Sequence, residues 1–205
     1  MEVNTKVNLS GLILDNPVIP ASGTFGFGKE YVDFYDINIL GSISIKGTTV
    51  QRRKGNPQPR IAECYSGLIN SVGLENPGME NVIQKELKDL EMIYRKPVIA
   101  NISGFSVEEY ITLAKEMDKV DNVGIIEVNI SCPNVDHGGL AFGTNADNVR
   151  ELTKKIKEVT TKPIYMKLSP NVTDIKEIAR AAQEGGADGI SLINTLMGMR
   201  IDINR

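Results

Sequence analysis

The run GIIEVNIS (124–131) combines the pattern of a β-strand with polar residues at its far end. Its branched apolar residues are typical of a strand, in which successive side chains point to opposite faces. Asn129 and Ser131 therefore share one face with Glu127, and the apolar residues between them lie on the other. A parallel strand buried on both faces is normally almost wholly apolar. These polar groups therefore need partners at the end of the strand.

Three other runs end in the same way, with Lys or Asn, any residue, then Ser or Thr. They are Lys46-Gly-Thr48, Asn101-Ile-Ser103 and Lys167-Leu-Ser169. Each unpaired buried polar group costs roughly 1–3 kcal/mol, so four such ends are better explained by one shared ligand than by local loop contacts. Strand ends that converge on a ligand are the active-site geometry of a TIM barrel.

The rest of the chain alternates strand-like runs with helix-patterned segments, which predicts a parallel sheet covered by helices. Expected strands cover 16–22, 41–48, 96–103, 124–131, 162–169 and 187–195; helical spacing covers 79–93, 106–117, 149–159 and 175–182. A doubly wound sheet would also fit, but the glycines of SGTFGFG (22–28) lack the GxGxxG spacing of a dinucleotide site. We therefore expect an α/β fold, a TIM (β/α)8 barrel of which about six strands are recognisable.

Composition narrows the class of protein. The 205 residues are 41% hydrophobic and 24% charged, and the net charge of −3 gives no electrostatic case for a nucleic acid partner. We interpret the basic run 51–60 as a solvated loop. No secretion signal or membrane-length apolar stretch is visible, and two cysteines are too few for a disulfide framework or a zinc site. We expect a cytoplasmic protein without a metal site.

Cys132 follows Asn129 by three residues and enters a loop punctuated by glycines at 138, 139 and 143. A free thiol has a pKa of about 8.5 and can remove a proton when a nearby cation or desolvation tunes it. The alternative is a small buried side chain. The position of Cys132, at a strand end before a loop, favours a catalytic role over a buried one. Cys64 lacks this setting and is expected to be buried, and His137 to be a surface hydrogen-bonding residue.

The expected strand-end site is rich in hydrogen-bond donors and poor in acids, with two lysines and the amides of Asn101, Asn129 and Asn194. Such a site suits a flavin ring beside a pyrimidine or a keto acid. Lys167 could equally form a Schiff base, as in barrel aldolases. Composition alone leaves these alternatives open.

Five motifs occur along the chain in this order: KGTT (46–49), NSVGLENPG (70–78), NISCPNVDHGGLAFG (129–143), KLSP (167–170) and LINT (192–195). Together they resemble class 1 dihydroorotate dehydrogenases, and HGGLAFG is most similar to the class 1B, NAD-linked catalytic subunit. The resemblance implies oxidation of dihydroorotate to orotate in de novo pyrimidine (UMP) biosynthesis, with FMN as hydride acceptor.

The resemblance also implies residue roles. Cys132 would be the catalytic base. The implied substrate-binding residues are Lys46, Asn70, Ser71, Val72, Gly73, Leu74, Asn129, Asn194 and Thr195. The implied FMN-binding residues are Ser22, Lys46, Gly47, Asn101, Asn129, Lys167 and Ile193.

The implied partners are a second copy of the chain and an electron-transfer subunit that carries FAD and an iron–sulfur cluster. This chain has too few cysteines to hold such a cluster itself. Members of the resembled class continue beyond the position of Arg205, with two further strands and phosphate-binding loops. We therefore expect residues 1–205 to form a single, incomplete FMN-binding barrel domain, with weak FMN binding and negligible turnover on its own.

Three other functions remain open. The first is another FMN-dependent barrel oxidoreductase, of the dihydropyrimidine or dihydrouridine type. The second is a Schiff-base aldolase that uses Lys167. The third is a catalytically inactive fragment that only binds a partner subunit.

Overall fold

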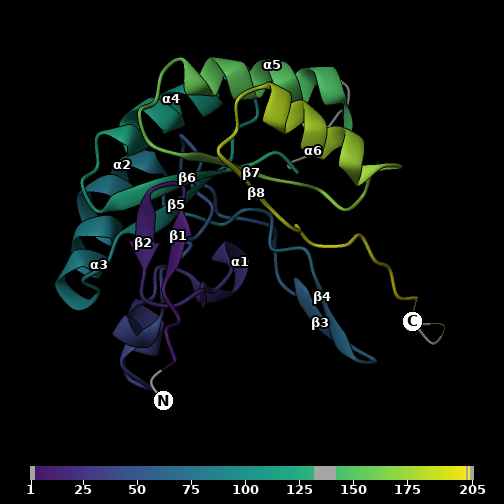
Figure 1. Ribbon diagram of the computed structural model, residues 1–205. Helices are drawn as coiled ribbons and strands as arrows, with labels where there is room; N and C mark the ends of the chain where they lie inside the picture. Colours follow the sequence, from purple (N-terminus) through teal and green to yellow (C-terminus); the bar gives the residue numbers. More distant parts are fainter. Residues whose placement is uncertain (1–2, 132–141, 202, 204–205) are drawn as a thin grey trace.

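The structure is a computed structural model that describes residues 3–131, 142–201 and 203 (Figure 1). A parallel sheet contains β5 (Val98–Ile102), β6 (Val123–Asn129), β7 (Ile164–Lys167) and β8 (Gly189–Ser191), in chain order. Successive strands are joined by α4 (Val107–Asp118), α5 (Ala146–Lys157) and α6 (Ile175–Glu184). Figure 1 shows these helices together on one side of the sheet, with α1 (Ser22–Phe25) on the other. This is the expected strand–helix alternation.

The register of the sheet aligns the polar strand ends. Asn101 of β5 pairs with Glu127 of β6, and Asn129 of β6 pairs with Lys167 of β7. Lys167 pairs in turn with Ser191 of β8. Because all four strands run in the same direction, these side chains meet at one edge of the sheet.

Two of the six expected strands do not form regular ladders. The run 41–48 lies beside β5 but pairs through two isolated parallel bridges, Ser44 with Ile99 and Thr48 with Ile102. The run 16–22 is joined to the run 41–48 by a backbone hydrogen bond, in which the N–H of Gly41 donates to the carbonyl of Val18 at 2.9 Å. Its prolines, at positions 17 and 20, carry no backbone N–H and cannot donate to a ladder.

Two antiparallel hairpins were not expected from the sequence. β1 (Val7–Leu9) pairs with β2 (Leu12–Leu14), and β3 (Ile61–Cys64) pairs with β4 (Gly67–Asn70). The first turn has positive φ at both central residues, Ser10 and Gly11, which suits the twist of a tight hairpin. Strands of three or four residues are too short to show a clear alternation. Cys64 is only half-buried, so its expected burial was wrong; it ends a short strand of a peripheral hairpin.

The expected helices are confirmed. Residues 79–93 form α2 (Met79–Asn81), a π-helical turn η3 (Val82–Glu86) and α3 (Leu87–Ile93). Ser106 caps α4, since its Oγ accepts from the backbone N–H of Glu109 at 3.2 Å. Short 3-10 helical turns also occur: η1 (Lys29–Tyr31), η2 (Ile37–Ile39) and η4 (Phe142–Thr144). No helix in the described part of the chain is long and apolar enough to cross a membrane.

The core lies between the sheet and its helices. Fully buried side chains from both layers include Leu113, Met117, Ile126, Val128, Ile156, Ile164 and Met166. Burial of each such side chain contributes about 1.5–3 kcal/mol. The sheet is therefore anchored on its helix-covered face, and its carboxyl edge is left for polar residues.

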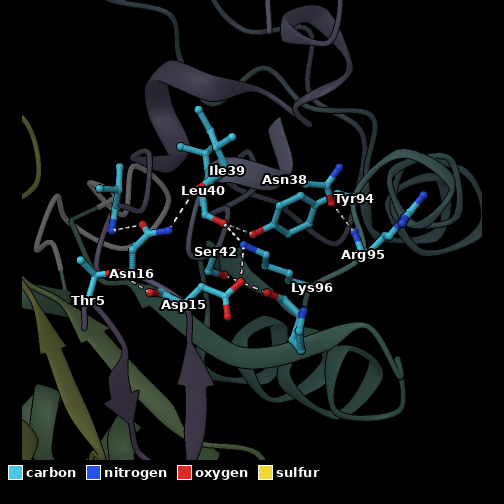
Figure 2. Close-up of polar contacts among 12 residues, drawn as sticks. Thr5, Asp15, Asn16, Asn38, Ile39, Leu40, Ser42, Tyr94, Arg95 and Lys96 are labelled. Carbon is cyan, nitrogen blue, oxygen red and sulfur yellow. Dashed lines mark hydrogen bonds and ion pairs between the residues drawn. The ribbon is translucent and has the colours of Figure 1, made fainter. Parts of the chain in front are cut away.

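A polar cluster lies at the amino-terminal end of β5, just before the strand begins (Figure 2). The Lys96 ammonium donates to the carbonyl of Leu40 at 2.8 Å and lies 2.9 Å from Oδ2 of Asp15. The hydroxyl of Tyr94 donates to the same Leu40 carbonyl at 3.2 Å. These bonds join the end of the first hairpin, the turn η2 and the entry to β5.

Candidate active site

A hollow of about 400 Å³ lies at the carboxyl edge of the sheet. Its walls come from α1, the run after position 45, the hairpin β3–β4, the loop after β4, and the residues that follow β8. The lining residues are Ala21, Ser22, Gly23, Thr24, Lys46, Gly47, Ile61, Leu68, Asn70, Val72, Gly73, Leu74, Asn101, Asn129, Lys167, Ile193, Asn194 and Thr195. Its volume and mixed lining suit a small ring-shaped ligand.

The structure brings together all but two of the residues expected to bind substrate or cofactor or to act as the base. Ser71 does not line the hollow: its N–H donates to the Arg60 carbonyl, and its own carbonyl accepts from Nδ2 of Asn56 at 2.7 Å. Cys132 lies outside the described residues, as does His137.

Sequence reasoning missed five lining residues. Ala21, Gly23 and Thr24 belong to α1 and its approach, and Ile61 and Leu68 belong to the hairpin β3–β4. The pairing of Ile61 with Asn70 places Ile61, Leu68 and Asn70 on one face of the hairpin. The run GLIN (67–70) places two apolar residues side by side and shows no alternation, so it carries no sequence signal for this face.

Glu127 supplies an acid at the base of a site that was expected to be poor in acids. Its side chain is buried, and Oε2 accepts from Nδ2 of Asn101 at 2.5 Å and from Oγ of Ser44 at 3.2 Å. The ammonium of Lys167 lies 3.8 Å from the same oxygen and donates to Oγ of Ser22 at 3.3 Å. Residues from three other segments thus meet at the Glu127 carboxylate.

The amide of Asn101 is only partly satisfied. Its Nδ2 is bonded to Glu127, but its Oδ1 is buried and has no hydrogen-bond partner among the residues that the structure describes. An unsatisfied buried acceptor costs about 1–3 kcal/mol. Asn101 also lines the hollow, so the orientation of its amide helps to shape the site.

Lys46 brings a second cation to the hollow. Burial is the main cause that lowers the pKa of its ammonium; the nearby Glu75 carboxylate opposes this effect and Arg60 adds to it. Within the described ranges Lys46 forms no ion pair, whereas Arg60 and Glu75 pair with each other. A half-buried ammonium without a carboxylate is suited to an anionic ligand. No cluster of three or more potential metal ligands is found in the described part of the chain.

Comparison with known proteins agrees with this arrangement. The family model described as "Dihydroorotate dehydrogenase" matches residues 4–205. The chain belongs to the dihydroorotate dehydrogenase family. The family fold is a TIM barrel, so the parallel strands described here are part of such a barrel.

Members of the dihydroorotate dehydrogenase family from three bacilli are similar to the chain along almost all of its length. The "Dihydroorotate dehydrogenase B (NAD(+)), catalytic subunit" of Bacillus cytotoxicus is 57% identical over 198 residues, which are 97% of this chain. The proteins of the same description from Bacillus cereus and Bacillus anthracis are 56% identical over 198 residues. The chain spans 64% of the length of these relatives.

Proposed function

We propose that this chain is the catalytic part of a flavin-dependent dihydroorotate dehydrogenase, which oxidises dihydroorotate to orotate in pyrimidine (UMP) biosynthesis. One observation carries the proposal: Lys46, Asn129 and Lys167, from three separate segments, surround one hollow at the carboxyl edge of the sheet. Similarity to B-type catalytic subunits supports it.

The residues around the hollow fit FMN. The isoalloxazine ring presents alternating carbonyl and N–H groups, which match the Lys167 ammonium and the amides of Asn101 and Asn129. We propose that Ser22, Lys46, Gly47, Asn101, Asn129, Lys167 and Ile193 hold FMN. When bound, FMN supplies the hydride acceptor of the reaction.

Dihydroorotate is a small anion with an amide-rich ring, and the rest of the lining matches these features. We assign its carboxylate to the ammonium of Lys46 and its ring carbonyls and N–H groups to the amides of Asn70, Asn129 and Asn194. The loop from Val72 to Leu74 and the backbone near Thr195 would enclose it. The half-buried position of Lys46 strengthens its attraction to a carboxylate.

We propose Cys132 as the base that removes the C5 proton of dihydroorotate through its Sγ. The support is its position in the chain, three residues after Asn129, which lines the hollow. A thiolate near a lysine ammonium is stabilised, which makes such a thiol an effective proton acceptor near neutral pH.

We further propose that residues 1–205 form one FMN-binding domain that acts in the cytoplasm. Its proposed partners are a second copy of the chain and an electron-transfer subunit with FAD and an iron–sulfur cluster. The words "catalytic subunit" and "NAD(+)" in the names of the relatives support a separate subunit that passes electrons to NAD.

The test is the absorbance of the FMN-loaded protein during anaerobic addition of substrate. We expect dihydroorotate to reduce the flavin and so lower its visible absorbance, and we expect dihydrouracil to leave that absorbance unchanged. Bleaching by dihydrouracil would instead indicate a dihydropyrimidine enzyme. Borohydride trapping of a keto acid on Lys167 would indicate an aldolase, and partner binding without any flavin would indicate an inactive fragment.

A further inference from the structure

The proposed reaction leaves one buried carboxylate without a role. Glu127 is 7% exposed, lies in the carboxyl half of β6, and contacts Asn101 and Lys167, which line the hollow. A buried ionised carboxylate is costly unless several donors satisfy it. Here a single oxygen, Oε2, accepts hydrogen bonds from Ser44 and Asn101 and lies 3.8 Å from the ammonium of Lys167. These three residues belong to three different segments.

The first consequence concerns the Asn101 amide. An asparagine amide has two orientations, and its oxygen would be repelled by a neighbouring carboxylate. The short bond from Nδ2 to Glu127 selects the orientation in which Oδ1 faces away from the carboxylate. That oxygen, on a residue only 1% exposed, has no partner in the described part of the chain.

Gly47 packs directly against this oxygen. A Cβ built on Gly47 would lie 2.8 Å from Oδ1 of Asn101, closer than real contacts allow. Gly47 and Asn101 both line the hollow. Oδ1 of Asn101 is therefore turned away from Glu127 and packed closely against Gly47, and together the two contacts fix the shape of the lining at this point.

The second consequence concerns the charge of Lys167. Its ammonium lies 3.8 Å from Glu127 and also lines the hollow. Opposite charges at this distance, both largely withdrawn from water, offset each other's field. Glu127 therefore reduces the positive potential that Lys167 exerts on a ligand.

We propose that Glu127 is a positioning residue for the flavin site. Through Oε2 it holds the Asn101 amide in one orientation, with Oδ1 turned away from the carboxylate and against Gly47, and it offsets part of the Lys167 charge beside the ring. This inference rests on the proposed function, because it requires FMN in the hollow.

The chain contains a matched control. Glu86, in η3, is also a buried carboxylate, and it pairs with a lysine, Lys29, at 2.6 Å. Neither residue lines the hollow. Glu86→Gln therefore removes a buried charge and an ion pair in the same way as Glu127→Gln, but at a position remote from the proposed flavin.

The experiment compares Glu127→Gln and Glu86→Gln in the intact protein. The FMN dissociation constant is measured from flavin fluorescence, and the reduction potential of bound FMN is measured against a reference dye. Because a glutamine oxygen can replace Oε2 as acceptor, we expect Glu127→Gln to change the FMN dissociation constant by less than about threefold. We expect its potential to rise, because the Lys167 charge is no longer offset, and Glu86→Gln to leave both values unchanged.

A second comparison tests the orientation of the amide. Glu127→Leu should weaken FMN binding by about tenfold or more, since it removes the acceptor for Nδ2. The same change made in an Asn101→Ala background should have a much smaller effect, because the two residues act as one unit. Equal losses in both backgrounds would overturn the proposal.

Three further results would overturn it: an unchanged potential in Glu127→Gln, an equal shift in Glu86→Gln, or a loss of FMN affinity beyond about tenfold in Glu127→Gln. If Glu127→Leu does not fold, the potential of Glu127→Gln still decides. Wild-type protein that binds no FMN would contradict the proposed function itself, whereas flavin-loaded wild type with an unshifted Glu127→Gln variant contradicts only this inference.

Discussion

Nδ2 of Asn194 donates a 2.8 Å hydrogen bond to Oδ1 of Asn129, a residue 65 positions earlier in the chain. The same oxygen accepts from the backbone N–H of Ser131 at 3.1 Å. With two donors on Oδ1, the amide of Asn129 has a fixed orientation. Its Nδ2 makes no hydrogen bond to any residue that the structure describes and is left for a ligand carbonyl.

This pair leads to the first prediction. Asn129→Ala should lower kcat/KM for dihydroorotate by about 10- to 100-fold, because it removes a ligand contact and leaves the Asn194 amide without its acceptor. The control is Asn122→Ala, since Asn122 donates only to the carbonyl of Leu87, away from the hollow. Steady-state kinetics check the prediction; equal activity in the two variants would contradict it.

Two glycines of the hollow are expected to respond differently to an added methyl group. Gly47→Ala would place a Cβ 2.8 Å from Oδ1 of Asn101, whereas Gly23→Ala meets no atom within 4 Å. We expect Gly47→Ala to weaken FMN binding by at least about tenfold and Gly23→Ala to change it by less than about threefold. Flavin fluorescence titration measures both. A weaker effect at position 47 than at position 23 would show that the contact between Gly47 and Asn101 does not shape the flavin site.

The third prediction concerns pH and orotate binding. Burial lowers the pKa of Lys46 below its usual 10.5, so its charge is lost at a lower pH than in a free lysine. Affinity for orotate, an anion, should therefore fall as the pH rises through that lowered pKa. Lys46→Arg should show no such fall, because arginine remains charged. Isothermal titration at several pH values checks this, and identical profiles for wild type and Lys46→Arg would contradict it.

The charge of Lys46 is expected to favour orotate binding but to destabilise the ligand-free fold. A lysine with a lowered folded-state pKa destabilises the fold while it is charged, and this cost is relieved as the pH rises from the folded pKa towards the unfolded pKa. Lys46→Met should therefore raise the melting temperature of the ligand-free protein by about 2–4 °C and abolish orotate binding. Calorimetry near pH 7 measures the shift; a lower melting temperature would show that the ammonium stabilises the fold.

The polar cluster before β5 gives a prediction that concerns stability alone (Figure 2). Tyr94→Phe removes the donor to the Leu40 carbonyl and should lower the free energy of unfolding by about 0.5–1.5 kcal/mol. Lys96→Ala should cost more, about 1–3 kcal/mol, because it removes a charged bond to the same carbonyl and the pair with Asp15.

The control for this cluster is Lys85→Ala. Lys85 pairs with Asp89 at 2.6 Å, but both side chains are largely exposed, so the loss should stay within about 0.5 kcal/mol. Urea denaturation of the three variants provides the comparison. Similar losses in all three would show that the cluster does not contribute more than a surface ion pair.

The parallel sheet and its helices were predictable because local patterns control them. The apolar spacing around Val149 and Ile156 specifies a helix that packs on the sheet, and both residues are fully buried. Strand-end residues such as Asn101 and Lys167 could be identified because polar groups are out of place in a buried parallel strand. The hairpins could not be predicted, since strands of three or four residues carry too little periodic information.

By itself, the sequence determined the alternation of the four parallel strands with their helices, the polar strand ends, and the family to which its motifs are similar. These features depend on residues that are close together in the chain. Only the tertiary structure decided that Ile61 and Leu68 line the hollow, and that Glu127 serves Ser44, Asn101 and Lys167 through one oxygen. Such contacts join segments separated by tens of residues, and their distances depend on packing and register, which local sequence patterns do not specify.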